Sequence, residues 1–325
     1  MASITIPVQS KDHPHMRPLN VLRDLSPVAD LIELCFASTM DNDGQRYVDD
    51  MRRASASNDR LARWANHMAE TTSLPLTGYV WDENNRIIGN ASLIPFRDQG
   101  KRIYLIANVA THPDHRRRGI ARALTQRAVE HARAKHAAAI WLHVRDDNPG
   151  AVKLYEDLGF REIVRRTAWT AHSDSRTPKP DSTIQVIPRH PRFWAQQQDW
   201  LRRLHPDVLN WYAPLNLNAL KPGFWNWFYW LFMDFDLHQW AAVRNDDLLA
   251  TVSWMPRGGR SESVYLAAPA QTADHADAVT QLLLHARRAL SLHTTLTLEY
   301  PAAEMTEAIS AAGFKPRRTL IWMKA

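Results

Sequence analysis

The stretch that decides the fold is residues 109–122, VATHPDHRRRGIAR. Its first residues end a strand-like run, and a helix is expected to begin just after Gly119. Such a loop directs several backbone N–H groups and the positive end of a helix toward one spot. Gly119 lets the backbone approach a bulky ligand, and the arginines before it add charge-assisted contacts. The stretch predicts an anion site, although basic loops before helices are common in proteins.

Strand-like runs lie on both sides of this stretch, and a second helical pattern follows it. The strand-like runs cover residues 77–82, 87–96, 102–110 and 139–144. Asn148-Pro149 opens the second helix, because Asn is a favoured N-cap and Pro a favoured first helical residue. Further upstream we expect a strand over 16–25 and helices over 27–38 and 45–68. This mixture of strands and helices predicts an α/β (α+β) fold.

The second half of the chain repeats the same order of elements. Strands are expected over 240–244, 248–255, 263–268 and 295–300, with helices over 276–290 and 305–312. Gly313-Phe314 follows the last helix, as Gly159-Phe160 does in the first half, and the apolar positions match at a constant offset. This pattern indicates a duplication. We therefore predict two domains, 1–175 and 183–325, joined by a proline-containing linker over 176–182.

Bulk properties limit the classes of function. The chain has 325 residues and is 45% hydrophobic, which is enough for two cores. Its net charge of +6 is not gathered into one tract, so no nucleic-acid partner is expected. A single cysteine, Cys35, excludes a disulfide framework, and the N-terminus lacks a secretory pattern. The apolar stretch at 224–237 is too short to span a bilayer. We predict a cytoplasmic protein.

Three motifs in order carry a resemblance to a known family. They are VATHP at 109–113, RRRGIA at 116–121 and NPGAVKLYEDLGF at 148–160. Together they resemble the GNAT acetyltransferase superfamily, most closely over residues 77–165. The resemblance implies two GNAT-like domains, each a mixed, mostly antiparallel central sheet flanked by helices. It also implies an enzyme that moves acetyl from acetyl-CoA to a primary amine of a small molecule or peptide by direct attack.

The resemblance implies a role for the residues of each motif. The pantetheine arm of acetyl-CoA would be held by backbone hydrogen bonds of Val109, Ala110 and Thr111. The pyrophosphate would be held by Arg116, Arg117, Arg118, Gly119, Ile120, Ala121 and Arg122. Asn148 would also contact acetyl-CoA, with helix capping as its simpler role. A backbone N–H near Val109 to Thr111 would stabilise the oxyanion. No metal is expected in this site.

Tyr155 occupies the position that the family uses for its general acid, seven residues after Asn148. Its phenol can protonate the departing thiolate as negative charge develops on the sulfur. Tyr155 also lies on the apolar face of its helix, so a packed core tyrosine is the alternative.

The general base is open. Many relatives carry a glutamate on one of two strands that part at the active site, and neither 102–110 nor 139–144 contains one. His143 is the nearest substitute, because it lies five residues before Asn148 and an imidazole titrates in the useful range. The alternatives are Asn108 or His112 acting through a water, or no protein base.

The second half has lost the motif residues. Its matching loop, residues 268–275, has no arginine-glycine element, and Tyr155 and Asn148 correspond to Ile309 and Ala302. This half resembles a degenerate GNAT repeat. A non-catalytic acyl-CoA-binding regulatory module is therefore the alternative function. The aromatic run at 224–233 is core or domain interface, part of a pocket for a hydrophobic or cationic acceptor, or a surface that docks on a membrane. The oligomeric state is open, and a monomer with pseudo-dimeric domains fits the duplication.

Overall fold

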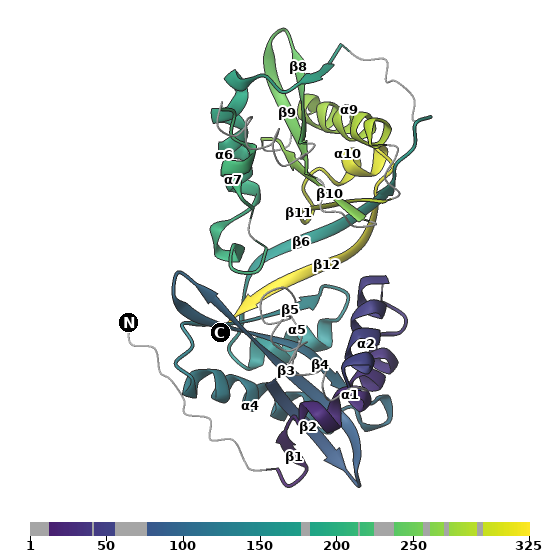
Figure 1. Cartoon of the computed structure of the whole chain (residues 1–325), viewed down its shortest axis with the longest axis vertical. Helices are drawn as coiled ribbons and strands as arrows, with labels where there is room; N and C mark the ends of the chain where they lie inside the picture. Colours follow the sequence, from purple (N-terminus) through teal and green to yellow (C-terminus); the bar gives the residue numbers. More distant parts are fainter. Residues whose placement is uncertain are drawn as a thin grey trace. The chain divides into compact units, whose positions relative to one another are not determined.

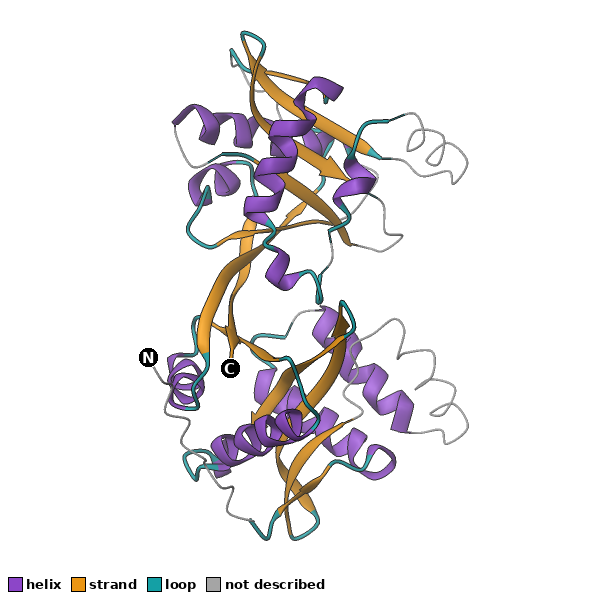
Figure 2. Cartoon of the chain, turned by 90° about the vertical axis from the view of Figure 1, so that its left-hand side faces the viewer, coloured by secondary structure: helices purple, strands orange, loops and turns teal. Residues whose placement is uncertain are grey.

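The computed structural model describes residues 13–40, 42–55, 77–176, 183–213, 215–223, 237–255, 261–269, 273–290 and 295–325. Contacts divide the chain into two compact units (Figure 1). Unit 1 comprises Met1–Val144, Asn148–Ile163 and Trp322–Ala325, and unit 2 comprises Arg145–Asp147 and Val164–Ile321. In each unit, helices flank a β-sheet (Figure 2).

Unit 1 is built on five strands in the order β1-β2-β3-β4-β5. Their bounds are β1 (Met16–Pro18), β2 (Thr77–Glu83), β3 (Arg86–Asp98), β4 (Lys101–Thr111) and β5 (Ala139–Arg145). The first four strands pair antiparallel, and β4 pairs with β5 in parallel. The central strand β3 is buried without a break from Ile87 to Ile94. A strand of this kind needs cover on both faces, since alternate side chains point to opposite sides.

Helices supply that cover. Their bounds are α1 (Val21–Phe36), α2 (Asn42–Ser55), α4 (Ile120–Ala134) and α5 (Pro149–Asp157), with a 3₁₀ turn at Pro113–His115. One core joins α1 and α2 to the sheet through residues such as Leu25, Val80 and Ala110. On the other face α4 lies so close to β3 that a Cβ added at Gly89 would stand 2.6 Å from a side-chain carbon of Ile120. Gly89 therefore permits the close approach of α4.

The predicted strand over 16–25 is wrong beyond Pro18. The chain instead begins α1 at Val21, because the Asn20 side chain accepts hydrogen bonds from the Leu22 and Arg23 amides at 3.1 and 3.3 Å. This N-cap satisfies amides that a helix start leaves unpaired. The helix predicted over 45–68 is confirmed as α2 up to Ser55, and its remainder lies outside the described residues.

Unit 2 is built on strands in the order β12-β6-β11-β10-β9-β8-β7. Their bounds are β6 (Arg161–His172), β7 (Gln185–Pro188), β8 (His238–Arg244), β9 (Asp247–Trp254), β10 (Ser261–Ala267), β11 (Thr295–Pro301) and β12 (Lys315–Lys324). The helices are α6 (Trp194–Leu204), α7 (Leu217–Leu220), α9 (Ala273–Ala289) and α10 (Thr306–Ala311), with 3₁₀ turns at Pro191–Phe193 and Asp207–Leu209. The strands β10 and β11 pair in parallel, and the β8-β9 and β9-β10 pairs are antiparallel.

The two units share one order of elements. The series β8-β9-β10-α9-β11-α10-β12 repeats the series β2-β3-β4-α4-β5-α5-β6 in type and order. Gly159 and Gly313 follow the two short helices with φ of 89° and 80°, a left-handed conformation that glycine adopts without steric cost. The predicted α+β fold with mixed, mostly antiparallel sheets is confirmed.

The compact units differ from the predicted domains 1–175 and 183–325 in where they place the two closing strands, β6 and β12. Most of β6 belongs to unit 2, where Thr167 is the register partner of Tyr300. Residues Trp322–Ala325 belong to unit 1, where the Ala325 amide donates to the Ile140 carbonyl at 3.0 Å. The predicted domain limits and the linker over 176–182 stay predictions, since 177–182 lie outside the described residues.

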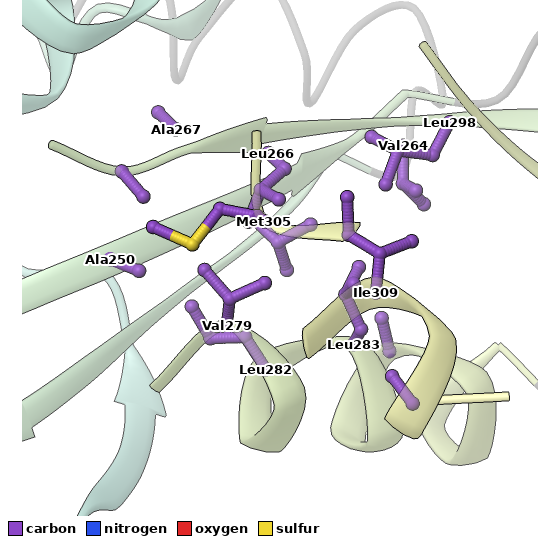
Figure 3. Packing of buried hydrophobic residues seen from close by; sticks show 14 of the residues in the cluster. Ala250, Val264, Leu266, Ala267, Val279, Leu282, Leu283, Leu298, Met305 and Ile309 are labelled. Carbon is purple, nitrogen blue, oxygen red and sulfur yellow. The ribbon is translucent and has the colours of Figure 1, made fainter. Parts of the chain in front are cut away.

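The core of unit 2 contains the counterpart of the proposed general acid. Met305 and Ile309, with exposed fractions of 1% and 0%, pack among apolar side chains of the sheet and α9 (Figure 3). Ile309 occupies the sequence position that matches Tyr155, so unit 2 has an aliphatic core residue where unit 1 has a phenol. The aromatic run at 224–233 lies outside the described residues.

Candidate active site

Strand β4 contains a bulge opposite β3. Asn90 pairs with Ala110 and Ser92 pairs with Ala107, so Asn108 and Val109 together face one residue of β3. Asn108 has a φ of 52°, the left-handed region that asparagine enters more readily than most residues. Its carbonyl leaves the regular ladder and accepts a hydrogen bond from Asn90 Nδ2 at 2.8 Å. Bulges of this kind redirect backbone groups, and they are frequent near active sites.

The bulge lies where β4 and β5 are no longer paired. Their parallel pairing runs from Ile103↔Ala139 to Ile106↔Leu142, whereas β4 continues to Thr111 and β5 to Arg145. His143 is therefore the first residue of β5 beyond the last paired position. This arrangement leaves the backbone of the β4 bulge unpaired on its β5 side.

The loop after β4 leads into the N-terminus of α4. Arg117 and Gly119 have φ of 65° and 80°, and a Cβ added at Gly119 would meet no atom within 4 Å. Backbone conformation, and not lack of space, is what requires glycine here. The first hydrogen bond of this turn joins the Ala123 amide to the Gly119 carbonyl at 3.0 Å. The amides of residues 119–122 precede it and have no partner within the helix.

Two arginines of this loop region are held by carboxylates. Arg118 pairs with Glu83 at 2.8 Å, and Trp81 Nε1 donates to the same carboxylate at 3.0 Å. These hydrogen bonds, first that of Trp81 and then that of Arg118, keep the pKa of Glu83 below its ordinary value. Arg122 pairs with Asp157 at 2.8 Å. The carboxylates fix the two guanidinium groups before any ligand binds.

The end of β4 has unused hydrogen-bonding capacity. Thr111 Oγ1 is buried and has no hydrogen-bond partner within the described ranges. The Thr111 carbonyl accepts from Cys35 Sγ at 3.3 Å and from Arg116 Nε at 3.4 Å. Burial raises the pKa of the Cys35 thiol, so the thiol is the form that donates. In the part of the chain that the structure describes, Arg117 makes no ion pair. An anionic ligand with an amide-bearing arm fits these groups.

Tyr155 and Asn148 lie on and at the start of α5. The Tyr155 side chain is 6% exposed, its ring centroid lies 6.1 Å from that of Phe160, and no described residue hydrogen-bonds its hydroxyl. Burial raises the pKa of Tyr155, so the phenol keeps its proton. Asn148 Oδ1 accepts from the Ala151 amide at 3.2 Å, which makes Asn148 the N-cap of α5.

His143 contacts the end of the chain. Its ring centroid lies 4.9 Å from that of Trp322, with the ring planes tilted by 58°. Trp322 is 5% exposed and is part of unit 1. The other residues considered as bases are engaged as well. Asn108 Nδ2 donates to the Tyr47 hydroxyl at 2.7 Å, and His112 Nε2 lies 2.8 Å from Arg86 Nη2.

Sequence reasoning missed five residues that contact the predicted site: Tyr47, Glu83, Asn90, Asp157 and Trp322. Only Asn90 carried a signal, because a polar residue inside a buried strand needs a partner for its side chain. The others reach the site through contacts between elements that are far apart in sequence. Within the described residues, no group of three histidines, cysteines or carboxylates could hold a metal ion. None of the described helices combines the length and the apolar character of a membrane span.

Part of the chain is similar to one family of known proteins. The sequence model of the Acetyltransferase (GNAT) family matches residues 44–160. The chain is 36% identical over 81 residues to the [ribosomal protein bS18]-alanine N-acetyltransferase of Escherichia coli, covering 25% of this chain and 53% of the relative. It is 29% identical over 114 residues to an L-methionine sulfoximine/L-methionine sulfone acetyltransferase of Salmonella typhimurium, covering 34% and 67%. Residues 44–160 are therefore the part of the chain that is similar to the GNAT acetyltransferase family.

The curated relatives match only in part, and the chain spans about half the length of the first of them, 53%. Solved structures match over nearly the whole chain. A GCN5-related N-acetyltransferase from Sphaerobacter thermophilus aligns over 96% of this chain and 96% of its own, with a TM-score of 0.54 and 14% identity. A fungal glucosamine N-acetyltransferase region aligns over 98% of this chain and 39% of its own, with a TM-score of 0.55 and 13% identity. These likenesses show the fold.

Proposed function

We propose that unit 1 is an N-acetyltransferase that moves acetyl from acetyl-CoA to a primary amine of a small molecule or peptide, in a complex that holds both substrates. The observation that carries the proposal is the bulge of β4 at Asn108 and Val109, placed where β4 and β5 have parted. An unpaired stretch of strand backbone beside an unpaired helix N-terminus suits an extended, amide-bearing arm that ends in a pyrophosphate.

The residues of unit 1 supply the contacts that acetyl-CoA needs. Val109, Ala110 and Thr111 offer backbone groups to the pantetheine arm, and the buried Thr111 Oγ1 has capacity for a further hydrogen bond. The amides of residues 119–122 and the positive end of α4 would bind the pyrophosphate. Arg116 and Arg117 add positive charge, and Arg118 and Arg122 are already fixed by their carboxylates. Asn148 would contact the ligand while capping α5.

The chemistry divides among three groups of the chain. The Val109 N–H donates to the carbonyl oxygen of the thioester as negative charge develops on it. His143 accepts the proton that the attacking amine loses. The Tyr155 hydroxyl gives its proton to the sulfur as the carbon–sulfur bond breaks, and burial keeps that hydroxyl protonated until then. The products are the acetylated amine and the free thiol.

The acceptor is a primary amine in this proposal because the matched relatives are named for an alanine of ribosomal protein bS18 and for L-methionine sulfoximine and L-methionine sulfone. Unit 2 acts as a degenerate GNAT repeat that holds no acetyl-CoA. Its Ile309 and Ala302 stand at the positions of Tyr155 and Asn148, and neither offers a proton or a side-chain hydrogen bond. We place the reaction in the cytoplasm.

Calorimetric titration with acetyl-CoA, followed by a thiol-release assay over a panel of amines, tests this function. Tyr155→Phe should bind acetyl-CoA as the parent protein does, and kcat should fall by about 100-fold, since general acid catalysis contributes on that order. Tyr104→Phe is the matched control, because Tyr104 is a buried tyrosine of β4 whose ring contacts His131 on α4.

Three results would decide against parts of the proposal. Failure to bind acetyl-CoA removes the assignment of the ligand. Equal turnover by Tyr155→Phe and the parent protein removes Tyr155 as the acid. Tight binding of acetyl-CoA without turnover of any amine favours the regulatory module, which the lack of a glutamate on β4 and β5 also suggests.

A further inference from the structure

A chain of hydrogen bonds in unit 1 surrounds the β4 bulge, and its outer members, Tyr47 and Asn90, take no part in the chemistry proposed above. It runs from Tyr47 on α2 to the Asn108 side chain, and from the Asn108 carbonyl to the Asn90 side chain on β3. The three residues therefore hold one peptide unit, Asn108–Val109, from both sides. They come from three different elements, so the contacts form only when the fold is complete.

The burial of the polar Asn90 side chain costs free energy. Its exposed fraction is 0%, and it stands in a strand whose neighbours are buried and mostly apolar. Its Nδ2 donates to the Asn108 carbonyl at 2.8 Å and to Ser92 Oγ at 3.1 Å, whereas its Oδ1 is buried without a partner. An unpaired buried amide oxygen costs free energy. The two hydrogen bonds of Nδ2, to the bulge carbonyl and to Ser92, compensate for part of the cost of burying this side chain.

Tyr47 holds the side chain of Asn108. Its hydroxyl accepts a hydrogen bond from Asn108 Nδ2 at 2.7 Å. Burial of the Tyr47 side chain raises its pKa, so the neutral phenol is the partner that Asn108 contacts. With its side chain held by α2 and its carbonyl held by β3, Asn108 is kept at its φ of 52°. Without these contacts, an asparagine would leave the left-handed region of φ and ψ for regions that are more populated.

The direction of the Val109 amide follows from peptide geometry. In a trans peptide the carbonyl and the following N–H point in opposite directions, and the chain has no cis bond in the described residues. The Asn108 carbonyl points to the Asn90 side chain, so the Val109 N–H points away from that side chain, in a part of β4 that has no pairing partner on β5.

We propose that Tyr47 and Asn90 are positioning residues that hold the Asn108–Val109 peptide so that its N–H is aimed at the thioester carbonyl oxygen. The proposal rests on the acetyltransferase function of unit 1 and adds residues to it. Neither side chain contacts the reacting atoms. Each acts through Asn108, and a small misalignment of an oxyanion donor is enough to slow acyl transfer.

Tyr47→Phe removes the hydroxyl and keeps the ring, so it tests the proposal with little change of volume. We expect kcat to fall by about tenfold, because the donor is misaligned and not removed, with KM for acetyl-CoA unchanged. Tyr79→Phe is the matched control, since the Tyr79 hydroxyl bonds His131 Nδ1 at 3.0 Å, on α4 and away from the bulge. Equal kcat values for the two variants would overturn the proposal.

Asn108→Gly gives a second test. Glycine accepts the same φ but has no side chain for Tyr47 to hold. If Tyr47 acts through Asn108, then Tyr47→Phe should cause no further loss of kcat in the Asn108→Gly background. Additive losses would mean that Tyr47 acts by another route, which contradicts the proposal.

Amide NMR separates this inference from the function on which it rests. In the parent protein the Val109 N–H signal should shift more with acetyl-CoA than with CoA, because only acetyl-CoA has the carbonyl. The difference should shrink in Tyr47→Phe and persist in Tyr79→Phe. An inactive parent protein with this pattern would refute the acetyltransferase function and retain the positioning role. Equal shifts with both ligands would refute the positioning role, whatever the turnover.

Discussion

Tyr155 shows how one side chain can be both a core residue and a catalytic candidate. It is 6% exposed and packs beside Phe160, as a structural tyrosine would. A structural tyrosine usually finds a partner for its hydroxyl, however, and among the described residues Tyr155 has none. The same burial raises the pKa of the phenol. A packed ring and a hydroxyl without a hydrogen-bond partner among the described residues can occur together, and both suit a general acid.

The raised pKa of Tyr155 sets an expectation for the pH profile. Burial disfavours the phenolate, so the folded-state pKa lies above the ordinary tyrosine value of about 10. The acid should therefore stay protonated, and kcat should not fall through loss of its proton, up to at least pH 10. Initial rates between pH 6 and 10 measure this. A fall of kcat near pH 8 that disappears in Tyr155→Phe would contradict the assignment.

Among the elements, the loop between β4 and α4 has a backbone conformation that restricts its sequence. Arg117 and Gly119 are both in the left-handed region, and the amides of the first turn of α4 follow directly. Without this geometry the same arginines would be charges on an ordinary solvated loop. The proposed anion site therefore depends on the glycine as much as on the positive charges.

Gly119→Ala should weaken acetyl-CoA binding and destabilise the fold. An L-residue at a φ of 80° costs about 1 kcal/mol, so part of the population should leave the binding conformation. Gly159→Ala imposes a similar penalty at a φ of 89° at the end of α5 and serves as the control. Denaturant unfolding should show similar losses of stability for both variants, and calorimetry should show weaker acetyl-CoA binding only for Gly119→Ala. Equal affinities would contradict the loop assignment.

The elements differ in how far the sequence could predict them. The sequence predicted the cap at Asn148, the turn at Gly119 and the apolar runs, because each depends on residues that are neighbours in sequence. The limit of β1 was missed because the apolar residues after Asn20 fit a strand or a helix, and the Asn20 cap decides for the helix. Of the bulge partners, Asn90 carried only the signal of a polar residue in a buried strand, and Tyr47 carried none. Their contacts depend on how α2 and β3 pack on β4.

For the whole molecule, the notable feature is that each closing strand contributes to the other half of the chain. The last residues, Trp322–Ala325, belong to unit 1, and most of β6 belongs to unit 2. Trp322 contacts His143, and Lys324 Nζ lies 5.8 Å from the centroid of the Trp141 ring. The second half of the chain thus completes the sheet edge beside the candidate base, although its own motif residues are lost.

Trp322→Ala should loosen β5 of unit 1. Removing a buried tryptophan leaves a cavity and typically costs about 3–5 kcal/mol, and the loss here falls beside His143. Hydrogen exchange of peptides from β5 should accelerate, with less change in peptides from β8. Trp240→Ala is the control, because Trp240 is a buried tryptophan of β8 in unit 2 and should give the opposite pattern. Unchanged exchange in β5 would contradict the role of the closing strand.

In the proposed function, unit 1 binds acetyl-CoA and Tyr155 protonates its sulfur. A crystal structure of the full chain with CoA tests it most directly. We predict the pyrophosphate at the amides of residues 119–122, the pantetheine arm along Val109–Thr111, and the sulfur within hydrogen-bond distance of the Tyr155 hydroxyl. A CoA molecule bound in unit 2, or a sulfur out of reach of Tyr155 in unit 1, would contradict the account.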